Sequence, residues 1–439
     1  MGRAMLVSDI RVISSERSCQ LQAHVTAGTL GTDFLLYYRF PPEYEHVIDA
    51  SIGDPFVAML LVPAMRSGET LEIHAEVSPK LMQATAKIQQ TFATWNPEFS
   101  QIRVKAPVRQ NPPEAHGSRR GLFFSCGIDS FYSLMRNESR SQQEEDKSIS
   151  DLIVLRGFDI HYGRRDSGLY DRLLHNSLRV ADGLGIRTLP VATNARELTD
   201  RYVHTSWSSG GFLASVGLCL QKVFREVLIA ASDTYGQLVP WGSHPYVDPL
   251  WSTESLTIVH DGCEATRLDK IRFLADSPLV METLRVCFQS YATLTHSPRL
   301  YNCGMCEKCM RTMVGLHIAG ALTRCRTLPR TIDIELLRNT DRGERLFHQT
   351  MDLIENLGSS QSDLIIKSAL QDALHSLGRR RMRRRMLRTG TYLVARYAPG
   401  LMPLWRSIAR VLMRMHVPDR RLVERSEGRQ IKEGLSRDA

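Results

Sequence analysis

The chain has 439 residues, of which 43% are hydrophobic and 23% charged, and its formal net charge is +9. This length suffices for two or three domains with a substantial core, and the composition is that of a globular protein, not a disordered or fibrous one. No stretch approaches the roughly 18 apolar residues of a membrane-spanning helix, and residues 1–17 lack the apolar centre of a signal peptide. We therefore expect a cytoplasmic protein whose nine cysteines are thiols or metal ligands, not disulfides.

Residues 1–112 are predicted to form an N-terminal α+β accessory domain. Apolar runs predict strands at 30–40, 71–77 and 101–106 and helices at 54–68 and 79–95, the latter with Ser78 as its N-cap. The Pro-containing stretch 111–117 is typical of a linker. The region holds no catalytic pattern, so we expect it to shape the substrate site or to act as a scaffold.

Residues 119–327 alternate strand and helix patterns, which predicts an α/β domain with a doubly wound parallel sheet. The expected strands are 122–125, 151–160, 186–193 and 228–232, and the expected helices are 131–137, 170–184 and 212–227. Ligands of such sheets bind at the carboxyl ends of the strands, where loops lead into helices.

The segment SCGIDS, Ser125 to Ser130, falls at such a strand-to-helix junction. Gly127 allows a tight turn and a close approach of the backbone, and Ser125 and Ser130 supply hydroxyls. The following helix directs free N–H groups and its positive end at the loop, which favours an anion such as phosphate. Asp129 fits beside an anion if Mg²⁺ bridges the two, although the segment could also be an ordinary helix start capped by Ser and Asp.

Four cysteines further along the chain have the spacing of a metal site. Cys303, Cys306 and Cys309 form C-x₂-C-x₂-C, and Cys287 precedes them in LRVCFQS. Four thiolates in tetrahedral geometry are the ligands that structural Zn²⁺ prefers. Cys325 and His296 are alternative fourth ligands, while the remaining cysteines are interpreted as ordinary core thiols, namely Cys19, Cys219 and Cys263.

SCGIDS resembles the Ser-Gly-Gly-x-Asp-Ser signature of the PP-loop ATP pyrophosphatases, with Cys126 in place of the first glycine. The resemblance implies that the loop binds the β- and γ-phosphates of ATP with Mg²⁺, so that attack on the α-phosphorus leaves an adenylated acceptor. It implies catalytic roles for Asp129 and Ser130. The nucleotide contacts that it implies are Ser125, Cys126, Gly127, Ile128, Asp129, Ser130, Phe158, Asp159 and Gly211. We interpret Cys126 as a small-residue replacement and not as a nucleophile.

The loop and the cysteine cluster together resemble 7-cyano-7-deazaguanine synthases and their relatives over residues 119–315. That family carries a zinc ion on four cysteines, which implies Zn²⁺ at Cys287, Cys303, Cys306 and Cys309. The resemblance implies an AMP-forming ligase that adenylates a carboxylate or amide oxygen for attack by a nitrogen nucleophile. The chain is longer than those synthases, so we expect a different small-molecule acceptor. The alternatives are a tRNA-modifying sulfur transferase with an iron–sulfur cluster and a non-catalytic nucleotide-binding factor.

Polar residues after the strand 228–232 could serve an acceptor, and two cations beside the cysteines could meet phosphate or face solvent. The acceptor group is His244, Asp248, Glu254, His260 and Asp261. The cations are Lys308 and Arg311.

The C-terminal part is predicted to be a helical extension, 328–377, followed by a basic amphipathic tail, 378–439. Residues 378–425 hold 14 arginines and two acidic residues, a net charge of +12, which leaves −3 for the rest of the chain. Such a segment could bind RNA or an anionic membrane surface, or could be a solvated helix or a partner-binding tail. The sequence does not predict the oligomeric state.

Overall fold

The computed structural model describes most of the chain. The described residues are 3–29, 31–111, 117–141, 148–160, 168–287, 301–340, 346–376, 378 and 404. The chain divides into two compact units, residues 1–332 and 333–439. Apart from Gly378 and Leu404, the predicted basic tail lies outside the described residues, as does His296. Within the described part of the chain, no helix is both long enough and apolar enough to span a membrane.

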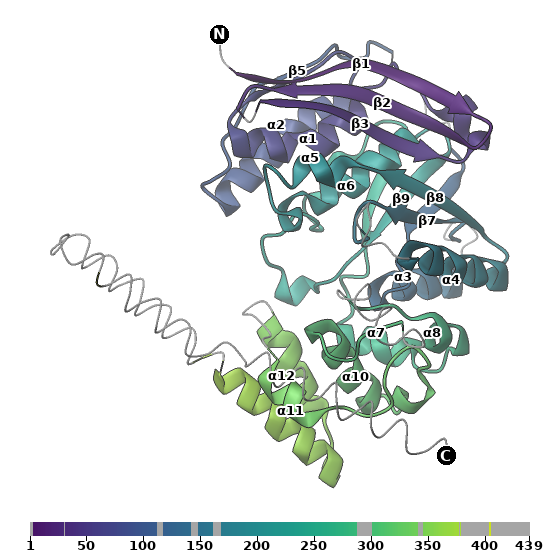
Figure 1. Ribbon diagram of the computed structural model, residues 1–439, viewed down its shortest axis with the longest axis vertical. Coiled ribbons are helices and arrows are strands. Elements are labelled where there is room, and N and C mark those ends of the chain that lie inside the picture. Colours follow the sequence, from purple (N-terminus) through teal and green to yellow (C-terminus); the bar gives the residue numbers. More distant parts are fainter. Residues whose placement is uncertain are drawn as a thin grey trace. The chain divides into compact units, whose positions relative to one another are not determined.

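Ten strands of the first unit form one sheet, in the order β10-β9-β6-β7-β8-β3-β2-β1-β4-β5 (Figure 1). The strands are β1 (Ala4–Ser15), β2 (Ser18–Ala27), β3 (Thr32–Phe40), β4 (Thr70–Ile73), β5 (Val104–Lys105), β6 (Arg119–Phe123), β7 (Asp151–Arg156), β8 (Arg187–Thr193), β9 (Phe224–Ala230) and β10 (Thr257–Asp261). The five strands from β10 to β8 run parallel to one another. The three pairings from β8 to β1 are antiparallel.

The N-terminal strands extend the same sheet that carries the α/β pattern. Tyr38 of β3 pairs with Thr193 of β8, so the sheet continues across the predicted boundary near residue 112. Residues 1–332 accordingly form one compact unit. The coarse prediction of an α/β fold with a mostly parallel sheet flanked by helices is confirmed.

Helices connect the strands and cover the sheet. In the first unit they are α1 (Asp54–Ser67), α2 (Pro79–Trp95), α3 (Ile128–Ser141), α4 (Leu169–Leu184), α5 (Ala195–Thr199), α6 (Thr205–Cys219), α7 (Arg267–Leu274), α8 (Pro278–Thr283) and α10 (Glu307–Ile318), with 3-10 turns η1 (Pro42–Val47), η3 (Tyr235–Gln237), η4 (Asp248–Trp251) and η5 (Leu322–Arg324). The second unit contains α11 (Ile334–Asn339), α12 (Phe347–Asn356) and a helix at 361–376. Ser78 caps α2 as predicted, because its hydroxyl accepts a hydrogen bond from the N–H of Leu81.

The predicted helix 212–227 is wrong over its second half. Helix α6 ends at Cys219, and the chain turns back within four residues so that β9 begins at Phe224. Val227 then pairs with Gly121 of β6 on one side and with Ile258 of β10 on the other. The apolar residues on either side of Gln221 and Lys222 were interpreted as one helix, whereas these two polar residues lie in the turn between α6 and β9.

Side chains of the parallel strands alternate between two hydrophobic cores, one on each face of the sheet. In β6, Phe123 belongs to the core that α1 and α6 cover, whereas Leu122 belongs to the core that α3, α4 and α10 cover. Both faces of this half of the sheet are therefore buried, as in doubly wound folds.

Candidate anion and metal sites

The loop between β6 and α3 has an unusual backbone at Cys126. This residue has a φ of +56°, in the left-handed region, whereas Gly127 is not among the residues of positive φ. The left-handed residue of the turn is thus a cysteine, not the glycine on which the sequence argument placed the turn. Burial raises the pKa of the Cys126 thiol to about 12, despite its hydrogen bond with Ser177. A protonated, buried thiol packs and does not act as a nucleophile at neutral pH.

The hydroxyl of Ser130 organises the backbone of this loop. It accepts hydrogen bonds from the N–H groups of Gly127 (3.2 Å) and Ser125 (3.4 Å), and donates one to the carbonyl of Gly127 (3.1 Å). Ile128, the first residue of α3, is buried in the core beneath. The segment is therefore a compact turn whose shape depends on Ser130.

Asp129 points toward two cations of α7. Its Oδ2 lies 3.0 Å from a guanidinium nitrogen of Arg267, and its Oδ1 lies 3.4 Å from Nζ of Lys270. Burial by itself raises the pKa of Asp129, but the charges of Arg267, Lys270, Lys308 and Arg311 outweigh it and hold the pKa below its ordinary value. The carboxylate is ionised, and the sequence prediction of an Mg²⁺ ligand stays a prediction.

Among the described residues, cations outnumber acids around the loop. The cations are Arg267, Lys270, Arg285, Lys308 and Arg311, and the acids that act on them are Asp129, Asp159 and Glu307. The side chains of Arg267, Lys270 and Arg311 are each at least nine-tenths buried. Among the described residues, Nε of Arg267 and Nε of Arg285 have no hydrogen-bond partner. Buried charges are costly unless they are paired, so this arrangement favours a bound polyanion.

The other nucleotide contacts that the resemblance implies lie at two places. Phe158 and Asp159 follow β7 at the same edge of the sheet, where Asp159 is exposed and its charge acts on Lys308. Phe158 packs its ring 4.8 Å from that of Phe212 on α6. Gly211 lies where α6 crosses α1: a Cβ there would come within 2.4 Å of a backbone oxygen of α1. Helix packing therefore explains this glycine.

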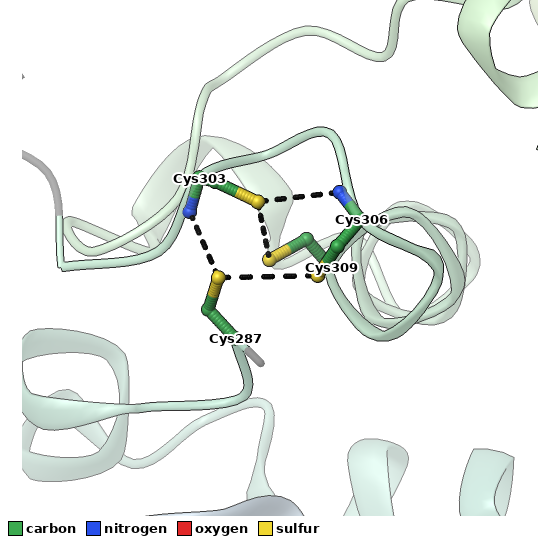
Figure 2. A group of neighbouring side chains, drawn as sticks. All are labelled: Cys287, Cys303, Cys306 and Cys309. Atoms are coloured by element: carbon green, nitrogen blue, oxygen red, sulfur yellow. Dashed lines mark hydrogen bonds between the residues drawn. The ribbon is translucent and has the colours of Figure 1, made fainter. Parts of the chain in front are cut away.

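The structure brings the four predicted metal ligands together (Figure 2). The sulfur atoms of Cys287, Cys303, Cys306 and Cys309 all lie within 4.8 Å of one another. Backbone N–H groups of the C-x₂-C turn donate to Sγ of Cys303, from Met305 (3.4 Å) and Cys306 (3.2 Å). Hydrogen bonds from the other three thiols lower the pKa of Cys287 well below its ordinary value. The four sulfurs could hold a metal ion such as zinc.

The sulfur spacing is that of a single ion. A tetrahedron with metal–sulfur bonds of about 2.3 Å has sulfur–sulfur edges of about 3.8 Å. The distances are 3.8 Å between Cys303 and Cys309 and 3.9 Å between Cys287 and Cys306. A four-iron cluster interposes iron atoms and sulfides and holds its cysteine sulfurs farther apart. The donor set therefore fits one tetrahedral ion, and Cys325, which is hydrogen-bonded to Thr327, is not among the clustered ligands.

Two chain segments connect the metal ligands to the loop. Two residues before Cys287, the N–H of Arg285 donates to the carbonyl of Cys126 at 2.8 Å. Cys306 is the N-cap residue of α10 and Cys309 lies in its first turn, while Lys308 and Arg311 of the same helix are three residues apart and their charges act on Asp129. The two segments that place cations around the loop therefore also carry the four clustered sulfurs.

Two of the five residues suggested for an acceptor form a buried group. Nδ1 of His260 lies 2.7 Å from Oδ2 of Asp248, and the hydroxyl of Ser243 donates to the same oxygen at 2.6 Å. The His260 side chain is 5% exposed and Asp248 is fully buried. Burial by itself lowers the pKa of His260, but hydrogen bonds with Asp248 and Cys263 outweigh it and raise the pKa to about 9. His260 lies near the carboxyl end of β10, which is two strands away from β6 in the sheet.

The other three residues of that group lie elsewhere. Glu254 accepts a hydrogen bond from Ser78 at 2.6 Å and so lies against the start of α2. Asp261 forms an ion pair with Arg136 of α3 at 3.1 Å. The ring of His244 packs against a tryptophan of α2, with the centroids 4.9 Å apart.

Sequence reasoning missed Arg267, Lys270 and Arg285. A signal for the first two was present: both occupy the first turn of α7, where the helix dipole disfavours cations. Cations placed there after the carboxyl end of a parallel strand indicate an anion or an acidic partner. Arg285 gave no such signal, because its place beside Cys126 depends on tertiary structure.

Comparison of this chain with protein-family models, with curated proteins and with solved structures found no match.

Proposed function

We propose that this protein binds ATP at the loop 125–130 and uses it to adenylate an oxygen of a small-molecule acceptor. The observation that carries the proposal is a pair of largely buried arginines, Arg267 and Arg285, beside a strand-to-helix loop at the carboxyl edge of a parallel sheet. The Nε atoms of both have no hydrogen-bond partner among the described residues. The sequence resemblance to PP-loop ATP pyrophosphatases supplies the reaction class. The acceptor oxygen attacks the α-phosphorus, pyrophosphate leaves, and a nitrogen nucleophile then displaces AMP.

The chain's own residues contribute positioning and charge neutralisation. Negative charge accumulates on the leaving pyrophosphate, and Arg267, Lys270, Arg285, Lys308 and Arg311 surround the place where it develops. Ser130 holds the loop N–H groups in a fixed turn. Binding of the phosphates requires no large rearrangement of the site, because the cations already lie around the loop before the nucleotide binds.

The four-sulfur site holds one Zn²⁺ ion in this proposal. Its role is to fix Arg285 and α10, and it takes no part in the transfer of the adenylyl group. The sulfur spacing supports a single ion. Metal analysis of protein purified without oxygen tests the assignment: zinc and a colourless sample are expected, and iron with labile sulfide would contradict it and favour the sulfur transferase.

The binding step is tested by calorimetry with ATP and with pyrophosphate. Arg285→Gln is expected to weaken both affinities by on the order of tenfold or more, because it removes a buried cation. Arg179→Gln is the matched control, since Arg179 is 43% exposed and pairs with Glu282 on the surface. If the wild-type protein binds neither ligand, or if the two variants behave alike, the proposal is wrong.

The chemical step is tested by screening carboxylic acids and amides with ammonia for ATP-dependent release of AMP. The reaction class requires AMP and pyrophosphate in equal amounts with an acceptor present. Release of ADP and phosphate would contradict it. Tight ATP binding without AMP release from any acceptor would favour the non-catalytic nucleotide-binding factor.

A further inference from the structure

Both oxygens of Asp129 are engaged by cations of the same helix. Arg267 is the first residue of α7, and Lys270 follows within its first turn. Each takes a different oxygen of the carboxylate, at 3.0 and 3.4 Å. Nζ of Lys270 also donates to the carbonyl of Ala231, directly after β9, at 2.6 Å. Asp129 therefore links α3, α7 and the end of β9.

These two cations occupy an unfavourable place. The dipole at the N-terminus of α7 disfavours positive charge, and the side chains of Arg267 and Lys270 are 9% and 1% exposed. The helix starts there because Thr266 and Asp269 form a capping box, so its position does not depend on the cations. A carboxylate opposite them offsets the cost, and Asp129 is that carboxylate.

The pairing leaves one polar group of Arg267 uncommitted. Among the described residues, its Nε is buried and has no hydrogen-bond partner. A guanidinium that is anchored at one nitrogen by Asp129 keeps its remaining N–H groups in a fixed direction. Such a group is suited to contact a phosphate oxygen.

We propose that Asp129 is a positioning residue that holds Arg267 and Lys270 for the phosphates of the bound nucleotide, and that it is not a ligand of Mg²⁺. The inference rests on the proposed ATP site. It replaces the role that the sequence resemblance implies for this aspartate. Charge on the phosphates is then neutralised by side chains, and binding does not require a divalent ion.

Because Asp129 is negatively charged, the direction in which Asp129→Asn changes the affinity for an anion distinguishes the roles that this residue could have. Simple Coulomb repulsion predicts that Asp129→Asn strengthens anion binding, because a negative charge is removed from the site. A role as metal ligand predicts that the variant loses only the dependence of binding on Mg²⁺. A positioning role predicts weaker binding even without Mg²⁺, because the two cations lose their anchor.

The experiment is calorimetric titration of the full-length, metal-loaded protein with inorganic pyrophosphate, with and without Mg²⁺. Without Mg²⁺, Asp129→Asn and Arg267→Gln are each expected to weaken binding by on the order of tenfold or more. The double variant is expected to be no weaker than Arg267→Gln, because both changes disable one unit. Arg272→Gln is the control: this arginine lies on the same helix and is 44% exposed. Its affinity should equal that of the wild type.

Thermal unfolding separates this role from a purely structural one. Asp129→Glu keeps the charge and is expected to recover part of the affinity that Asp129→Asn loses, at similar stability. Unchanged or tighter pyrophosphate binding by Asp129→Asn overturns the inference. It is also overturned if the wild type binds pyrophosphate only with Mg²⁺ and Asp129→Asn abolishes this dependence. Wild-type protein that binds no pyrophosphate under either condition overturns the proposed ATP site itself.

Discussion

Two parts of the ten-stranded sheet are built differently: a parallel half of five strands, and an antiparallel half of three strands that β4 and β5 extend in parallel pairings. The strands β10, β9, β6, β7 and β8 are parallel and have a hydrophobic core on each face. The strands β1, β2 and β3 are antiparallel, and their buried residues belong to the core on the α1 and α6 face alone. Parallel strands need helical crossovers, whereas antiparallel strands are joined by tight turns.

This difference explains where the polar residues of the candidate site lie in the sheet. Each crossover leaves a loop at the carboxyl edge, and the loops after β6, β7 and β10 carry Ser130, Asp159 and the α7 cations. The turn between β1 and β2 is two residues long, and its Glu16 and Arg17 are both exposed. The antiparallel half contributes support instead, since Asn194, at the end of β8, accepts a hydrogen bond from the N–H of Tyr37 on β3 at 3.0 Å. The polar residues of the candidate site therefore lie where connections cross between layers.

The largest expected effect comes from a metal ligand of the parallel half. Cys287→Ser removes one of the four sulfurs, and closed thiolate sites contribute on the order of 10 kcal/mol of apparent binding energy to folding. We expect loss of bound metal, a marked drop in the free energy of unfolding, and loss of pyrophosphate affinity, because Arg285 and α10 are then no longer held in place beside the loop. Metal analysis, chemical denaturation and calorimetry measure the three effects.

The matched control is Cys19→Ala in the antiparallel half. Cys19 of β2 is fully buried but lies outside the group of four sulfurs. We expect a loss of about 1 kcal/mol in stability with metal content and pyrophosphate affinity unchanged. Retention of metal and affinity in Cys287→Ser would show that the four-sulfur site does not organise the loop.

The sequence predicted the parts of the site that depend on short patterns. The C-x₂-C-x₂-C spacing predicted three of the sulfurs that the structure brings together, and Cys287 was the preferred fourth, with Cys325 and His296 left open. The position of SCGIDS at the junction of β6 and α3 followed from the alternation of strand and helix. Local spacing and local periodicity carry this information, because both are set by a few consecutive residues.

The remainder depends on how distant elements pack. Arg267 faces Asp129 because of the order of β6, β9 and β10 in the sheet and the packing of α7 against α3. No local sequence pattern encodes either feature. The same holds for Asp248 and His260, which were named individually but not as a pair. Gly211 was attributed to nucleotide approach, whereas contact between α1 and α6 already accounts for a residue without a side chain there.

A smaller effect is expected from the buried pair at the end of β10. The folded-state pKa of His260, about 9, lies above its ordinary value, so the pair stabilises the fold fully below about pH 6.5. That contribution is lost as the pH rises through about 9, and it amounts to about 3 kcal/mol. Urea unfolding across this range is expected to show the loss in the wild type and a flatter profile in Asp248→Asn.

An exposed histidine outside the parallel half provides the control for this experiment. His74 is 55% exposed and follows β4, so His74→Gln should retain the wild-type dependence of stability on pH. Equal pH profiles for the wild type and Asp248→Asn would mean that the buried pair does not carry the dependence. The comparison thus tests whether the pH dependence of stability comes from the buried pair Asp248 and His260.

The smallest effect concerns the backbone of the loop itself. Cys126 has a φ of +56°, a conformation that disfavours every residue with a Cβ by about 1 kcal/mol or more relative to glycine. Cys126→Gly is therefore expected to be more stable than Cys126→Ala by about 1 kcal/mol, since both variants lose the same buried sulfur. At Cys19, an extended position of β2, the order should reverse, because glycine in a strand interior costs about 0.5–1 kcal/mol relative to alanine. Denaturation of the four variants measures both differences. The same order at both positions would mean that the left-handed turn does not form in solution, and the compact loop that presents its N–H groups to phosphate would lose its geometric basis.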